Sequence, residues 1–115
     1  MGILNRSAVI IRPLPPYLAW ATRDDTTNIV ERVFEHLRTE PHVYLLPDYE
    51  DAESAREVRD DFWPDLFAAM LNCWLTDEPQ WPQDRTQEMF REWFDVQLYP
   101  SVENLHVDEE LIELD

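Results

Sequence analysis

The side chains that could carry chemistry are three histidines, one cysteine and a large number of carboxylates, and none falls into a catalytic or metal-binding spacing. His36, His42 and His106 show neither the HxxxH nor the HxH pattern of a metal site. Cys73 lies in the apolar run LFAAMLNCWL, which favours a buried, inert thiol over a nucleophile. The sequence therefore predicts no catalytic group, no metal site and no cofactor.

Two residue types that enzymes use widely are scarce or absent. The single glycine, Gly2, allows neither a P-loop nor a dinucleotide fingerprint, and no GxSxG elbow surrounds any serine. All nine basic residues are arginines, so Schiff-base chemistry and a lysine base are excluded. A small hydrolase or isomerase that uses acids and a histidine is the enzymatic alternative.

The acidity is confined to the second part of the chain. Of the formal charge of −16, residues 1–47 contribute zero, and residues 48–115 carry four arginines against twenty acids. Such a field repels nucleic-acid backbones and anionic membranes, and it favours basic partners. Solubility or salt adaptation is the simpler interpretation. The alternative is an acidic decoy that mimics nucleic acid and occupies a basic protein.

Four of these acids recur every four residues and predict a stripe along one helix: Glu53, Glu57, Asp61 and Asp65. Nothing in the stripe matches a calcium loop, and an open helix face cannot enclose an ion. A solvated face is the interpretation that the pattern favours.

Three short runs predict strands, and each ends at a proline. They are residues 7–12, 42–46 and 95–99. The connection between the first two is long enough for a right-handed crossover, so we expect that pair to be parallel.

Short helices are predicted between these strands. Pro16 opens the first, and residues 28–38 form the second with Thr27 available as its cap. A third is expected over residues 85–94, where Asp84 begins a capping box. The apolar residues of this third helix share one broad face, which indicates core packing.

The longest helix is predicted from Ala52 for about 24 residues, with a kink at Pro64. Two shorter helices meeting at Asp61 are the alternative. Its carboxyl half has a second apolar face: Trp63, Phe67, Leu71 and Trp74. A helix that is apolar on two sides must be covered on both, so these residues predict contact with another helix or with a second copy.

Trp81 precedes a proline in a loop, and two interpretations stay open for it. It is either an exposed aromatic that docks a partner or a lid over the start of the next helix.

Together the elements predict one α+β domain over residues 1–105, in two layers. A sheet of three or four strands is covered on one face by the long helix and two or three shorter helices. Residues 106–115 are expected to be an acidic, frayed tail. No signal peptide is evident, and no run approaches the roughly 20 apolar residues of a membrane span, so we expect a cytoplasmic protein.

Two segments resemble a family of small, acidic bacterial proteins with no known activity. They are LNRSAVIIRPLPPYLAWA (4–21) and WPQDRTQEMFREWFDV (81–96), continuing into SVENL (101–105). The segment 24–41 is longer and more helical than the resemblance implies. No catalytic or binding residue is carried over.

The functional expectation is a non-enzymatic, protein-binding or regulatory domain without direct nucleic-acid binding. It is expected to form a homodimer through Trp63, Phe67, Leu71 and Trp74, with Trp81 as a further protein contact.

Overall fold

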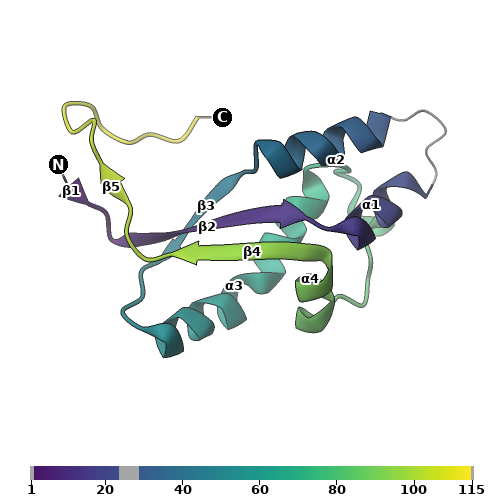
Figure 1. The fold of residues 1–115 in the computed structure, drawn as a ribbon, viewed down its shortest axis with the longest axis horizontal. Helices are drawn as coiled ribbons and strands as arrows, with labels where there is room; N and C mark the ends of the chain where they lie inside the picture. Colours follow the sequence, from purple (N-terminus) through teal and green to yellow (C-terminus); the bar gives the residue numbers. More distant parts are fainter. Residues whose placement is uncertain (1, 24–28, 115) are drawn as a thin grey trace.

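The computed structural model describes residues 2–23 and 29–114, and only the backbone of Val30. The predicted cap Thr27 therefore lies outside the described residues. Three strands form an antiparallel sheet in the order β3-β2-β4 (Figure 1). They are β2 (Arg6–Pro13), β3 (Val43–Pro47) and β4 (Phe94–Tyr99). All three predicted strands are thus confirmed.

Four helices and one 3-10 turn connect the strands within the described part of the chain. They are α1 (Pro15–Thr22), α2 (Ile29–Thr39), α3 (Ala52–Asn72), η1 (Glu78–Gln80) and α4 (Gln87–Trp93). The α+β class predicted from the sequence is confirmed. The long segment with Pro64 forms one helix, so the alternative of two helices meeting at Asp61 is wrong.

The prediction of a parallel first pair is wrong, because β2 and β3 are antiparallel. The two helices between them do not cross back along the sheet. Instead α1 continues beyond the end of β2, and α2 lies beside α1 and returns the chain to the same end of the sheet (Figure 1). Because this connection brings the chain back to the end of the sheet where β2 finished, the next strand has to run in the opposite direction to β2.

Two helix starts show how local sequence sets the element boundaries. Asp51 caps α3, with its carboxylate accepting from the Ser54 backbone N–H at 2.8 Å. Hydrogen bonds from Ser54 lower the pKa of the Asp51 carboxyl. At α4 the predicted capping box at Asp84 is wrong, since Thr86 is the cap and its hydroxyl accepts from the Met89 N–H at 3.1 Å.

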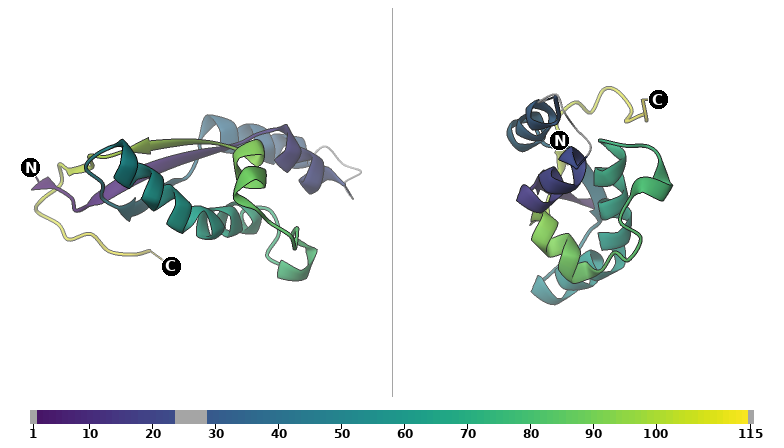
Figure 2. Two further views of the ribbon diagram at one scale, coloured as in Figure 1. Left: turned by 90° about the horizontal axis from the view of Figure 1, so that it is seen from below. Right: turned by 90° about the vertical axis from the view of Figure 1, so that its right-hand side faces the viewer.

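The sheet separates a covered face from an open one. Alternate residues of β2 point to the covered face and are buried: Ser7, Val9, Ile11 and Pro13. Figure 2 shows α3 and α4 against this face, as the sequence predicts, and no described helix lies over the opposite face. The neighbours that point outward, such as Ala8 and Ile10, are only half-buried.

The centre of the core is a cluster of aromatic rings between α3 and α4. Phe67 is fully buried, and its ring centroid lies 5.8 Å from that of Phe90, 5.5 Å from that of Trp93 and 5.3 Å from that of Phe94. Tyr17 joins the cluster from α1, 5.5 Å from Phe94. Aromatic contacts of this geometry add to the free energy gained by burying the rings.

A narrow arm extends the sheet beyond the start of β2 and the end of β4. β1 (Gly2–Ile3) and β5 (Glu103–Asn104) pair in antiparallel fashion, and the Leu4 N–H donates to the Val102 carbonyl at 2.7 Å. The β2–β4 ribbon therefore continues beyond the body of the domain (Figure 1). Residues 106–114 follow without a helix or strand and are exposed.

Candidate functional site

Three segments that are distant in sequence meet at the end of the domain opposite the arm. α1 begins directly after β2, because Pro15 and Pro16 occupy its first turn, where a proline needs no backbone donor. α4 precedes β4, and the loop around η1 reaches across from the end of α3. The Leu14 N–H donates to the Trp93 carbonyl at 2.8 Å and fixes α1 beside α4.

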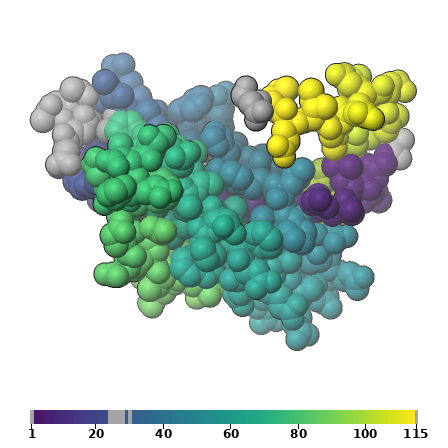
Figure 3. Space-filling view, turned by 180° about the vertical axis from the view of Figure 1, so that it is seen from behind, coloured from purple at the N-terminus to yellow at the C-terminus, as the bar shows by residue number. Residues whose placement is uncertain are grey.

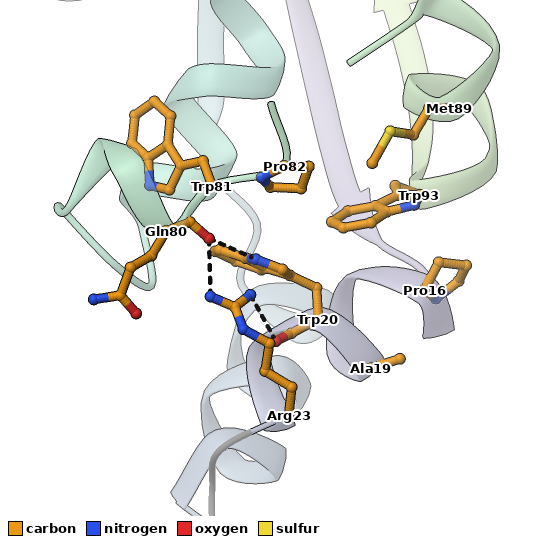
Figure 4. Close-up of a pocket in the computed structure, with 9 residues that line it drawn as sticks. All are labelled: Pro16, Ala19, Trp20, Arg23, Gln80, Trp81, Pro82, Met89 and Trp93. Atoms are coloured by element: carbon orange, nitrogen blue, oxygen red, sulfur yellow. Dashed lines mark hydrogen bonds between the residues drawn. The ribbon is translucent and has the colours of Figure 1, made fainter. Parts of the chain in front are cut away.

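These segments line a shallow, open aromatic hollow of about 550 Å³ (Figure 4). The indoles of Trp20 and Trp93 lie side by side in it, with ring centroids 6.2 Å apart and planes inclined by 42°. The other lining residues are Pro16, Ala19, Arg23, Gln80, Trp81, Pro82 and Met89. Such a surface suits an apolar or π-rich group, since rings and a thioether offer contact area and few hydrogen bonds.

Arg23 joins α1 to the η1 loop at one side of the aromatic hollow. Its guanidinium donates to the Gln80 carbonyl at 2.8 Å and lies 5.3 Å from the centroid of the Trp20 ring. The Trp20 Nε1–H donates to the same carbonyl at 3.3 Å (Figure 4). The loop is thereby held against α1, so this wall of the hollow is already formed without a ligand.

One polar group of the hollow is available to a ligand. Among residues 2–23 and 29–114, Trp93 Nε1 has no hydrogen-bond acceptor, and it is not a buried atom. Its ring is half-buried at the wall of the hollow. An indole N–H in this position can donate to a carbonyl of a bound chain.

The residues predicted to dock a partner are mostly used inside the domain. Phe67 and Leu71 are fully buried, and Trp63 and Trp74 are half-buried. The covering element for this helix face includes α4 of the same chain, because Trp63 and Phe67 both contact Phe90. Phe67 and Leu71 therefore offer no surface to a second copy, and Trp63 and Trp74 are the two residues of the predicted dimer face that stay partly exposed.

The exposed-docking interpretation of Trp81 is also wrong. Its side chain is 8% exposed, and its Nε1–H donates to the Leu75 carbonyl at 2.7 Å. The Arg85 guanidinium lies 5.7 Å from the centroid of its ring. Trp81 thus holds the η1 loop against the end of α3 and forms part of the hollow's wall.

A second group of reactive side chains lies where β3 meets the end of α3. The Cys73 Sγ is 3.7 Å from His42 Nδ1 and 4.0 Å from the Tyr44 hydroxyl. Burial raises the pKa of the Cys73 thiol, although the hydrogen bond with Tyr44 opposes this rise. A nucleophilic cysteine needs a lowered pKa, so this arrangement keeps the thiol neutral.

Cys73 is accordingly expected to react with iodoacetamide at least about 10-fold more slowly in the folded protein than in urea at pH 8. The rate should rise only as the pH passes the ordinary range of a thiol, because thiolate forms later than usual. His42→Ala is expected to leave the rate unchanged. Fast alkylation near neutral pH that His42→Ala abolishes would instead indicate a Cys–His catalytic pair.

The other histidines pair with carboxylates on open helix or loop surfaces. His36 lies 3.4 Å from Glu40, and His106 lies 2.8 Å from Glu109, with all four side chains exposed. Within the described ranges, no group of three or more histidines, cysteines or acids is placed to hold a metal ion. No helix in those ranges is both long and apolar enough to span a membrane.

The predicted acidic stripe does lie on the exposed side of α3, since Glu53, Glu57, Asp61 and Asp65 are all exposed. Figure 3 shows the helix side of the molecule, which segments after residue 50 mostly form. Successive acids of the stripe rise by about 6 Å along the helix. All four carboxylates thus lie in solvent, as expected of a solvated helix face.

No family model, curated protein or solved structure matches this chain. The resemblance to small acidic bacterial proteins therefore stays a prediction. The site therefore has to be interpreted from its own geometry. That geometry is an α+β domain with a preformed aromatic hollow at one end.

Sequence reasoning placed Met89 and Trp93 in the core together with Phe90 and Phe94. The structure divides this set, because Phe90 and Phe94 are buried and Met89 and Trp93 line the hollow. Periodicity alone could not make the division, since it depends on where α1 lies. The one local signal was the pair of prolines that starts α1 directly after β2.

Proposed function

We propose that the protein is a non-enzymatic cytoplasmic domain that binds an extended, proline-containing basic segment of another protein in the aromatic hollow. The observation that carries the proposal is the pair of adjacent indoles, Trp20 and Trp93, in a preformed hollow with almost no polar lining. Proline-rich segments dock in aromatic-lined grooves because they are already extended and lose little entropy on binding.

Charge supports a basic partner. Glu88 and Glu92 are exposed on α4, next in sequence to the lining residues Met89 and Trp93. The chain as a whole carries −16, so its field attracts a cationic segment and speeds its association. Arg23 keeps its positive charge, but its hydrogen bond to the Gln80 carbonyl fixes it at one side of the hollow, so the cationic residues of the partner are expected on the side of Met89 and Trp93 (Figure 4).

Isothermal titration calorimetry with the peptide acetyl-RPPLPR-amide tests the proposal. We expect a dissociation constant of about 10–100 µM, as is common for a short peptide in a small groove. Two matched peptides separate the contributions: acetyl-EPPLPE-amide reverses the charge, and acetyl-RGGSGR-amide removes the prolines. Each is expected to bind at least about 10-fold more weakly.

Ala19→Arg blocks the hollow without removing a packed side chain, because Ala19 is exposed on α1 and lines the hollow. This variant is expected to lose at least about 10-fold in affinity for acetyl-RPPLPR-amide. Ala52→Arg makes the same substitution at an exposed position of α3, far from the hollow, and should bind as the wild type does.

Equal binding by Ala19→Arg and the wild type would contradict the proposal, as would the absence of binding by every peptide. Binding that follows peptide charge alone and is insensitive to Ala19→Arg would favour the acidic-decoy alternative, which depends on the field and not on the hollow.

A further inference from the structure

The open face of the sheet is an apolar surface that no described helix covers. We name as the open face the six residues of its two central rows: Ala8, Ile10, Val43, Leu45, Gln97 and Tyr99. Ala8 lies between Leu45 and Tyr99 in one row, and Ile10 lies between Val43 and Gln97 in the next. Val43 is 58% exposed, Leu45 51% and Tyr99 45%. Contiguous exposed apolar side chains of this kind mark a docking surface.

We infer that a second copy of this chain packs against the open face, sheet on sheet, with the same residues on both sides. The argument begins from charge. The outward-pointing charged residues of the three strands are Arg6, Arg12 and Asp95, and Arg12 and Asp95 are direct cross-strand neighbours. The open face is therefore close to neutral on a protein whose net charge is −16.

The uneven distribution of charge over the molecule excludes most of the ways in which two copies could pack together. Acids dominate residues 48–115, and the segments after residue 50 form most of the helix side (Figure 3). Two copies that approached through that side would bring like charges together. Contact through the open faces instead places both helix layers on the outside, more than the Debye length of about 8 Å apart at physiological salt.

The charges around the open face also indicate that its occupant is not the basic partner proposed for the aromatic hollow. Two arginines and one aspartate offer nothing to attract a cationic protein. A second copy, in contrast, presents an apolar sheet of the same shape, and Arg12 of one copy can meet Asp95 of the other across a two-fold axis. Two sheets pack face to face at about 10 Å with their strands nearly aligned.

The area of the open face predicts a weak dimer. Eight residues of β2 and three strands span roughly 26 by 14 Å, or about 370 Å². A stable interface buries about 800 Å² on each partner, so the sheet supplies close to half. The arm beyond the sheet carries two further exposed apolar residues, Ile3 and Leu105, which are 72% and 70% exposed. We expect dissociation in the micromolar range.

Sedimentation velocity of the purified chain from about 5 to about 500 µM tests the inference. The wild type is expected to shift from monomer to dimer across this range. Leu45→Lys should weaken the dimer at least about 10-fold, since each copy then places a charge at the centre of the contact. Because half of the Leu45 side chain is already in solvent, this variant should keep the far-ultraviolet circular dichroism of the wild type.

Leu111→Lys is the matched control, because it makes the same change at a residue of the tail that is 66% exposed. It should dimerise as the wild type does. Higher salt should strengthen the dimer by screening the repulsion between two chains of −16.

A wild type that stays monomeric at the highest concentration would overturn the inference. So would equal dimerisation of Leu45→Lys and the wild type. If Leu111→Lys weakens the dimer as much as Leu45→Lys does, the tail of the second copy covers the open face, and the sheet-on-sheet arrangement is wrong. None of these outcomes depends on the aromatic hollow, because Ala19→Arg leaves the open face intact.

Discussion

Phe67→Ala is expected to lower the free energy of unfolding by about 3–5 kcal/mol, because it removes a ring that fills the centre of the core. Phe67 is fully buried, and three aromatic rings surround it within 6 Å between centroids. A loss of this size is a large part of the total stability of a small domain, which is typically about 5–15 kcal/mol. Urea denaturation followed by circular dichroism at a low protein concentration measures it.

Leu111→Ala is the control for this measurement, because an exposed tail residue should change the stability by less than about 0.5 kcal/mol. The test also separates two roles for Phe67. If Phe67→Ala leaves the monomer stable and instead dissociates a dimer, Phe67 lies at an interface, as the sequence predicted, and its place in the core is wrong.

The protein is expected to lose stability steeply above pH 10, because two tyrosine hydroxyls are held away from water. The Tyr17 side chain is 1% exposed, and its hydroxyl donates to the Met70 carbonyl at 2.8 Å. Burial raises the pKa of Tyr17, and the neighbouring Cys73 and Tyr44 raise it further. Burial likewise raises the pKa of Tyr44, with Cys73 adding to the rise.

The direction of the pH effect follows from these shifts. Below pH 10 the Tyr17 hydroxyl is neutral in both the folded and the unfolded chain, so its contribution to the free energy of unfolding is fully present. As the pH rises above 10 the unfolded chain loses the proton first, and the folded state loses stability by about 1.4 kcal/mol per pH unit for Tyr17. Tyr44 and the thiol of Cys73 act in the same direction.

Tyr17→Phe separates this effect from general alkaline unfolding. At pH 7 the variant should be about 1 kcal/mol less stable, since the Met70 carbonyl loses its donor. Above pH 10 its stability should fall less steeply than that of the wild type. Urea denaturation at several pH values measures both quantities, and an unchanged slope in Tyr17→Phe would show that Tyr17 does not set the alkaline limit.

Strands and helices followed closely from the sequence where a strong local signal was present. A proline ends β2 and β3 and directly follows β4, and it is a strong signal because proline lacks the backbone donor that a strand needs. The start of α3 at Ala52 was also predicted, and the structure shows that a capping box of Asp51 and Ser54 fixes it.

Local signals could not predict that β2 and β3 are antiparallel, nor which aromatic residues fill the core and which line the hollow. The sequence between β2 and β3 allowed a crossover, and only the packing of α2 on α1 decides that the chain returns antiparallel. Trp20 and Trp93 are 73 positions apart in the sequence, so no spacing relates them. The contact of Cys73 with His42 likewise depends on where β3 meets α3.

The pairing of β1 with β5 determines how the domain responds to mechanical force. β2 and β4 are antiparallel neighbours, and the arm brings their outer ends to the same side of the molecule. A force that pulls these ends apart opens the backbone hydrogen bonds one after another, as in a zipper, and does not load them all at once in shear. When the start of β2 and the end of β4 are pulled apart, the protein should therefore unfold at low force from the arm inward, and the aromatic hollow at the opposite end should open last.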